Sequence, residues 1–262
     1  MTDNIIDLYK GIELANRKRI NLLMEDWRNE VAPNKIKFKD GQTKSGKKCF
    51  AADGFYPGYY RQKNKLVFIA REMRYFGGDN IETGIDWYNN NEDHNQRPFI
   101  RHILNIVQGV KNDGKLKFKD LESANDYIKK MNNTNNYGFA TLNISKYANI
   151  SKTSRTADYK LMNQFLSQSN LDKRNYFTEE LTILQPNIIV TGNLLEWKID
   201  KSHINQCFGT LIEIKRFKKT KTVLYDMELN GEKIKLIDMP HFSDCHYTDK
   251  DLYNSIMKLL FG

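Results

Sequence analysis

The segment Leu66-Val67-Phe68-Ile69-Ala70, followed at once by Arg71-Glu72, decides the class of fold that this sequence predicts. A short continuous apolar run of this kind is typical of a strand that is buried on both faces of a parallel sheet. Residues 187–191 form a second such run, with Pro186 before it and Gly192 after it. The two runs indicate an α/β protein.

The chain around these two runs alternates between helical and strand patterns. Apolar spacing predicts helices at 99–110, 121–131, 157–166, 172–184 and 249–260, and strands at 138–143, 209–216, 221–229 and 233–239. Asn230-Gly231 predicts a type I′ turn between the last two strands. We therefore expect a three-layer α/β/α sandwich with a central, mostly parallel sheet.

The N-terminal part of the chain has a different character. Residues 3–31 have the spacing of one long amphipathic helix, and Pro33 ends it. Residues 34–50 are basic, and Asp40-Gly41 predicts a hairpin turn within them. We expect an N-terminal helix and basic arm at 1–50 and an α/β domain at 51–262.

The composition indicates a globular protein with an anionic partner. Of the 262 residues, 41 are Lys or Arg and 32 are Asp or Glu, which gives a net charge of +9, and 40% are hydrophobic. This balance excludes wholesale disorder. The positive charge favours nucleic acid, although a membrane surface or an acidic protein would also fit it.

The sequence gives no sign of a membrane span, an export signal or a bound metal. No apolar run approaches the roughly 18 residues of a membrane span, and Met1-Thr2-Asp3-Asn4 does not resemble the start of a signal peptide. The three cysteines form no CxxC pair. Cys245 lies near His241 and His246, but a fourth ligand at zinc-finger spacing is missing. We expect a cytoplasmic monomer without metal or cofactor.

Ligands of such sheets bind beyond the carboxyl ends of the strands, so the residues after Ala70, Asn143, Thr191 and Met239 are candidates for one site. The site would combine the Glu72 carboxylate, the Asn143 carboxamide and the His241 imidazole. Each has a plain structural alternative: an ion pair of Glu72 with Arg71 or Arg74, a turn role for Asn143, and a structural role for His241.

The order and spacing of these segments resemble the uracil-DNA glycosylase superfamily from about residue 53 to the end. The matching segments are Leu66-Val67-Phe68-Ile69-Ala70-Arg71-Glu72-Met73, Gln96-Arg97-Pro98-Phe99-Ile100, Phe139-Ala140-Thr141-Leu142-Asn143, residues 184–192, and residues 236–243 with Pro240-His241-Phe242-Ser243. Ala70, Met73 and Phe242 depart from the family motifs, and the cysteines of its iron–sulfur branch are missing. Arg74 stands where the classical branch has the Tyr that excludes 5-substituted bases.

The resemblance implies a monofunctional DNA glycosylase that hydrolyses the N-glycosidic bond of a flipped pyrimidine and leaves an abasic site. Glu72 would stabilise positive charge on the sugar, and His241 would donate to the departing base. Asn143 would read the base edge, and Phe99 would stack on the base. Arg71, Arg74 and Tyr75 would lie beside the base. The base would be uracil or a 5-modified pyrimidine, such as a modified cytosine of phage DNA, with a repair or an antiviral role respectively.

Contacts with double- or single-stranded DNA are expected from three regions. The residues are Lys215, Arg216, Lys218 and Lys219 at a hairpin tip, Lys146 and Lys152 after Asn143, and Ser243, His246 and Tyr247 after His241. The hairpin tip has the alternative of being a solvated loop. Two other functions stay open: a catalytically silent nucleic-acid-binding protein on the same scaffold, and a hydrolase of free nucleosides or nucleotides.

Overall fold

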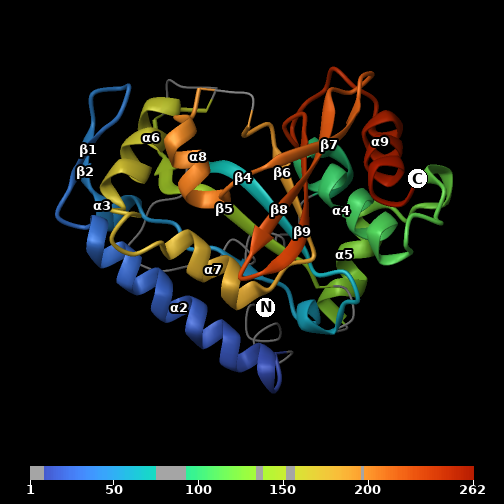
Figure 1. Ribbon diagram of the computed structural model, residues 1–262, viewed down its shortest axis with the longest axis horizontal. Coiled ribbons are helices and arrows are strands. Elements are labelled where there is room, and N and C mark those ends of the chain that lie inside the picture. The colour runs from blue at the N-terminus through green and yellow to red at the C-terminus, as the bar shows by residue number, and fades with distance from the viewer. Residues whose placement is uncertain (1–8, 75–92, 134–137, 152–156, 196–197) are drawn as a thin grey trace.

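The computed structural model describes residues 9–74, 93–133, 138–151, 157–195 and 198–262, which fold around one seven-stranded sheet (Figure 1). The spatial order is β3 (Gly54–Phe55), β5 (Ala140–Asn149), β4 (Leu66–Arg74), β6 (Ile188–Gly192), β9 (Glu232–Met239), β8 (Thr222–Leu229) and β7 (Ile212–Phe217). The four strands β5, β4, β6 and β9 run parallel. The remaining three strands join antiparallel at the two sides. The α/β class is confirmed, but the sheet is mixed rather than mostly parallel.

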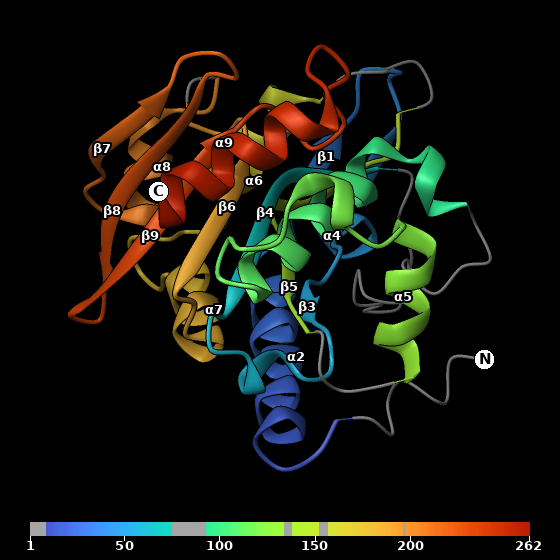
Figure 2. The ribbon, with the colours of Figure 1, turned by 90° about the vertical axis from the view of Figure 1, so that its right-hand side faces the viewer.

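The helices form two sets that are separated by the sheet (Figures 1 and 2). One set consists of α2 (Ile12–Val31), α3 (Gly46–Cys49), α6 (Tyr159–Gln168), α7 (Tyr176–Leu184) and α8 (Lys201–Phe208). The other consists of α4 (Pro98–Lys111), α5 (Ala124–Asn133) and α9 (Asp249–Phe261). Short 3₁₀ turns, η1 (Tyr59–Arg61), η3 (His94–Gln96) and η4 (Phe118–Asp120), connect these elements. The arrangement is compatible with three layers.

Two strands extend further than their apolar runs predict. β4 continues through Glu72 to Arg74, and β5 continues through Lys146 to Asn149. These extensions pair with each other, Glu72 opposite Ser145, after β4 has separated from β6 beyond Ile69. Within the extensions, Glu72, Lys146 and Asn149 are buried and bonded to partners in other segments, which an apolar pattern does not reveal.

Both predicted tight turns are present. Asn230 and Gly231 have φ angles of 54° and 81°, as a type I′ turn requires, and they connect Leu229 to its strand partner Glu232. Gly41, with a φ of 83°, lies in the turn between β1 (Lys35–Lys37) and β2 (Thr43–Ser45), so the basic arm is a hairpin. Helix α8 was not predicted because its apolar face has only three buried residues.

The N-terminal helix α2 is part of the packed core. Trp27 is fully buried, donates its indole N–H to Ser169 Oγ (2.8 Å) and stacks on Tyr176 with ring centroids 5.4 Å apart. Near the other end of the helix, Glu13 accepts hydrogen bonds from the N–H groups of Gly58 and Tyr60. Among the helices of the described ranges, none has the length and apolar character that crossing a membrane requires.

Trp27→Ala should lower the free energy of unfolding by about 3–5 kcal/mol, because it removes a large buried side chain and leaves a cavity. Urea denaturation would measure the loss. Leu22→Ala on the same helix is the matched control, since Leu22 is 64% exposed and its change should stay within about 0.5 kcal/mol. Equal effects of the two substitutions would show that α2 does not depend on its packing against the domain.

Candidate functional site

The strand register brings the predicted site residues to one edge of the sheet. Ala70 lies opposite Asn143, and Gly192 lies opposite Met239. After β4 the chain continues to β5, on one side of β4 in the sheet. After β6 it continues to the strands on the opposite side, of which β9 is the neighbour of β6. The carboxyl ends of β4 and β6 therefore flank the switch point at which α/β sheets bind ligands. The register thus places the carboxyl ends of β4, β6 and β9 at one edge of the sheet, with Asn143 beside the end of the apolar run of β4.

Gly192 allows the loop after β9 to lie over the end of β6. A Cβ atom at Gly192 would come within 3.0 Å of the Phe242 ring and 3.5 Å of His241 Cδ2. A residue of α4 also fixes the loop, because the buried His102 contacts the carbonyl oxygen of Phe242 through Nδ1 (2.7 Å). The other ring nitrogen of His102 lies 2.9 Å from Asp249.

His241 is held as a neutral hydrogen-bond donor. Its Nδ1 accepts the backbone N–H of Ser243 (3.2 Å), so the proton of the neutral ring resides on Nε2. Burial, and next the nearby Arg71 charge, lower the pKa of His241 to about 4, although Asp244 opposes them. At neutral pH the ring therefore presents Nε2–H without a positive charge.

Phe99 lies next to His241. Its ring centroid is 6.1 Å from that of His241 and 5.5 Å from that of Phe242, which it meets edge-on. Phe99 is half-buried in the first turn of α4, whereas Phe242 is fully buried and packs against Phe68. An aromatic face and a hydrogen-bond donor thus share this end of the sheet.

Asn143 lies within β5 rather than in a turn, and Asp53 fixes its carboxamide. Asp53 Oδ2 accepts the Asn143 backbone N–H (2.9 Å), and Oδ1 accepts its side-chain Nδ2 (3.1 Å). An ionised carboxylate can only accept, so the amide nitrogen must be the atom that faces it. The Asn143 side chain therefore turns its oxygen away from Asp53.

Glu72 is buried at the end of β4 and has two fixed donors. Its Oε1 accepts the side-chain Nδ2 of Asn149 and the backbone N–H of Asp158, both at 2.9 Å. Asp158 is the N-cap of α6, so this carboxylate also positions the start of that helix. Such contacts hold a charge in place and make Glu72 a fixed group.

Arg71 lies beside the His241 end of the site. Its guanidinium donates to the carbonyl oxygen of Asn193 (3.3 Å) and lies 5.5 Å from the centre of the Tyr159 ring. Burial lowers its pKa, although Tyr159, Asp238 and Glu72 oppose the shift. Arg71 thus supplies a partly desolvated cation between Glu72 and His241. The Arg74 side chain, Tyr75 and Lys152 lie outside the described residues.

Lys146 corrects one prediction, since it cannot contact a DNA backbone. The side chain is fully buried, and its ammonium binds Asp53, Glu180 Oε2 (2.9 Å) and the carbonyl oxygen of Asn143 (2.9 Å). It also lies 5.0 Å from the centre of the Trp27 ring. Sequence reasoning missed the two carboxylates. The sequence features that could have indicated them are the position of Asp53 at the start of an aromatic loop and that of Glu180 within an apolar helix.

The protonation of this buried cluster follows from its contacts. Burial raises the pKa of Asp53 and that of Glu180, the latter to about 8. Burial lowers the Lys146 pKa, but the two carboxylates outweigh it and raise the pKa. The raised pKa values of the two carboxyl groups indicate that one of them is protonated at pH 7. Asp53 accepts hydrogen bonds from the ammonium and from two N–H groups, so we assign this proton to Glu180. The three donors around Asp53 favour its ionised form.

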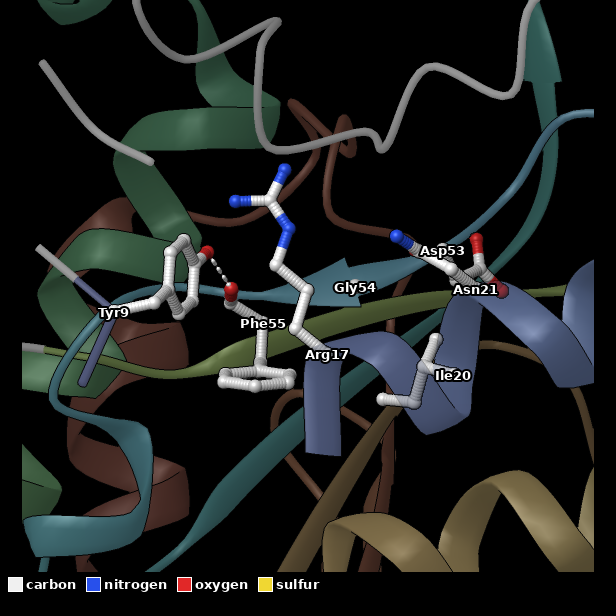
Figure 3. Close-up of a pocket in the computed structure, with 7 residues that line it drawn as sticks. All are labelled: Tyr9, Arg17, Ile20, Asn21, Asp53, Gly54 and Phe55. Atoms are coloured by element: carbon white, nitrogen blue, oxygen red, sulfur yellow. Dashed lines mark hydrogen bonds between the residues drawn. The ribbon is translucent and has the colours of Figure 1, made fainter. Parts of the chain in front are cut away.

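A small cavity lies on the other side of the Asp53 loop (Figure 3). It has a volume of about 10 Å³ and is lined by Tyr9, Arg17, Ile20, Asn21, Asp53, Gly54 and Phe55. The Tyr9 hydroxyl donates to the Phe55 carbonyl oxygen, and the Arg17 guanidinium lies 4.6 Å from the centre of the Tyr9 ring. The space suits about one water molecule and is far below the roughly 300 Å³ at which ligand pockets begin.

The basic hairpin tip projects from the same edge as the site (Figure 2). Val223 at the start of β8 pairs with Asp238 near the end of β9, so residues 218–221 extend beyond that end. Arg216 is paired with Glu213 (3.0 Å), and Lys219 with Asp251 (2.7 Å). Lys215 and Lys218 are exposed.

The loop after His241 is partly exposed. Ser243 and His246 are exposed, the latter with Nδ1 3.0 Å from Asp244, and Tyr247 packs against the core. Within the described ranges, no cluster of three or more His, Cys, Asp or Glu side chains is arranged to hold a metal ion.

Lys146→Met should lower the free energy of unfolding by about 3–5 kcal/mol, because Asp53 would remain buried without its ammonium. Glu180→Gln should cost far less, since glutamine resembles the protonated acid. Lys215→Met, at an exposed position, should stay within about 0.5 kcal/mol. Urea denaturation at pH 7 measures all three. A loss with Glu180→Gln as large as that with Lys146→Met would contradict the assigned proton.

Comparisons of the chain with protein-family models, with curated proteins and with solved structures found no match.

Proposed function

We propose that this protein is a monofunctional DNA glycosylase with a fold of the uracil-DNA glycosylase type. It hydrolyses the N-glycosidic bond of a pyrimidine that has left the duplex and leaves an abasic site. One observation carries the proposal: His241 is a neutral Nε2–H donor at the carboxyl edge of the sheet, next to Phe99. The net charge of +9 fits a DNA partner.

His241 suits the departure of the base. Cleavage leaves negative charge on an exocyclic oxygen of the base, and a preorganised donor stabilises that charge as it develops. Because its pKa is about 4, His241 stays neutral and acts through a hydrogen bond rather than by complete proton transfer. Its fixed Nδ1 contact with Ser243 keeps the donor nitrogen in one place.

Glu72 and Arg71 supply the charges beside the sugar and the base. The sugar gains positive character in the transition state, which the fixed Glu72 carboxylate would stabilise. The two donors on Glu72 favour electrostatic stabilisation over a mobile general base. Arg71 would face the base or a phosphate of the flipped nucleotide.

Asn143 and Phe99 would recognise the base. The oxygen that Asn143 presents can accept from a donor on a pyrimidine edge, which uracil offers at N3 and cytosine at its amino group. Phe99 would stack on the ring. The classical branch of the family has a Tyr that excludes 5-substituted bases, and Arg74 stands at that position here. Both uracil and 5-modified pyrimidines are therefore candidate substrates. Excision of a modified phage cytosine would make the role antiviral.

The bonds of Glu72 favour one alternative, a nucleic-acid-binding protein that does not excise. A carboxylate that positions Asn149 and the start of α6 has a structural task that needs no catalysis. The two functions differ in whether DNA is cleaved after alkali treatment, which one experiment measures.

Duplexes that carry uracil or a 5-substituted cytosine should break at that base when they are incubated with the protein and then treated with alkali. His241→Ala should slow excision about 10²–10³-fold, as loss of a transition-state donor does. Glu72→Gln should slow it to a similar degree while keeping Oε1 as an acceptor for Asn149 and Asp158. His203→Ala on α8 is the matched control and should leave the rate unchanged.

No scission of any duplex by the unaltered protein, with salt-sensitive DNA binding retained, would favour the silent binder. Release of free base from nucleosides alone would favour a nucleoside hydrolase. An unchanged rate in the His241→Ala protein would remove His241 from the chemistry.

A further inference from the structure

A second candidate binding site lies along α9, on the face of the sheet that α4 covers. It is a channel of about 580 Å³ between α9 and residues 114–119, which follow α4. Figures 1 and 2 both show this segment beside α9, and η4 contacts the helix. The residues described above for base excision do not line it.

Lysines dominate the walls of the channel. They are Lys115, Lys117 and Lys119 from the loop, and Lys250 and Lys258 from α9. All five are exposed, and the lining includes no acidic residue. None of the five forms an ion pair with a carboxylate in the part of the chain that the structure describes. Five cations around one hollow repel each other and attract a polyanion. Asp113 and Asp251 interact electrostatically with Lys115 and Lys250, but neither carboxylate lines the channel.

Aromatic side chains form the base of the same channel. Phe118 lies 5.8 Å from Tyr253, centroid to centroid, and the Tyr253 hydroxyl donates to the carbonyl oxygen of Leu116 (2.5 Å). Phe261 is 40% exposed at the end of α9. Gly114 packs so closely against Phe261 that a Cβ there would lie 2.6 Å from its ring. The loop is therefore fixed on the helix, and the channel is preformed.

Lysines beside an exposed aromatic ring, here Phe261, are the chemistry that binds a single strand of nucleic acid. The ammonium groups contact successive phosphates, and unpaired bases stack on the rings. Lys250 and Lys258 are eight residues apart on α9, about 12 Å along the helix axis. The length of the channel therefore suits an extended polyanionic backbone better than a single small anion.

The channel begins close to the candidate excision site. Lys250 follows Asp249, whose carboxylate contacts His102 (2.9 Å), and His102 contacts the carbonyl oxygen of Phe242 (2.7 Å) next to His241. Two successive contacts of His102 thus join the start of α9, where the channel begins, to the loop of His241. We propose that the channel along α9 binds a single-stranded segment of nucleic acid through its backbone and through one or more stacked bases. This binding requires no excision.

The test uses the full chain and a labelled single-stranded DNA oligonucleotide without uracil. The triple variant Lys117→Ala, Lys119→Ala and Lys258→Ala removes three channel cations. The matched control, Lys160→Ala, Lys173→Ala and Lys201→Ala, removes three exposed cations of α6, α8 and the segment before α7. Fluorescence anisotropy over a range of KCl concentrations gives the dissociation constant and its salt dependence.

The channel variant should bind at least about 10-fold more weakly, and its salt slope should fall by about 2, since each single-strand phosphate contact contributes about 0.7. The control variant should keep the slope of the unaltered protein. Phe261→Ala should weaken binding several-fold without changing the slope, because stacking involves no counterion. An RNA oligonucleotide should show the same loss of affinity and of salt slope, because the lysines contact phosphates that RNA and DNA share.

Equal losses in the channel and control variants would overturn the proposal, because they would reflect net charge alone. Loss of duplex binding with single-strand binding retained would also overturn it. So would loss of binding to anionic lipid vesicles with DNA binding retained, which would assign the channel to a membrane surface. Excision is measured in a separate assay on uracil duplexes. If the protein does not excise a base, the measurement of single-strand binding can still be interpreted.

Discussion

The buried ammonium of Lys146 is the interaction on which the rest of the structure depends. It connects β5, which carries it, to Asp53 before β3 and to Glu180 on α7, and it lies against Trp27 of α2. A buried charge that loses a partner destabilises a protein by several kcal/mol, so these four segments must be in place together. The N-terminal helix α2, helix α7 and the edge of the sheet at β3 and β5 are therefore specified jointly.

The same cluster prepares the candidate site. Asp53 binds Lys146 and also fixes the carboxamide of Asn143, so the charge that joins the layers also orients the group proposed to read the base. The loop of His241 is fixed independently by Ser243, Gly192 and His102. Donors and charges that are fixed before a substrate arrives need no reorganisation during the reaction, and this is the main source of catalytic electrostatic stabilisation.

The apolar runs and tight turns predicted the positions of β4 to β9, but not β3 or the polar extensions of β4 and β5. Asn230-Gly231 and the run from Leu66 to Ala70 act through local preferences that a sequence displays. The burial of Lys146 could not be predicted, because it depends on Asp53 and Glu180, which are distant in sequence. The pairing of Arg216 and Lys219 with acids, and the channel along α9, also arise only when separate segments meet.

Nitrogen-15 NMR of the imidazole tests most directly whether His241 is a neutral donor through Nε2, as its proposed role requires. The ring nitrogens of the uniformly labelled protein, assigned with a His241→Gln variant, report both charge and tautomer. We predict a neutral ring at pH 7 with the proton on Nε2, titrating only near pH 4 because burial and Arg71 disfavour the cation. An imidazolium at pH 7, or a neutral ring with the proton on Nδ1, would contradict the account.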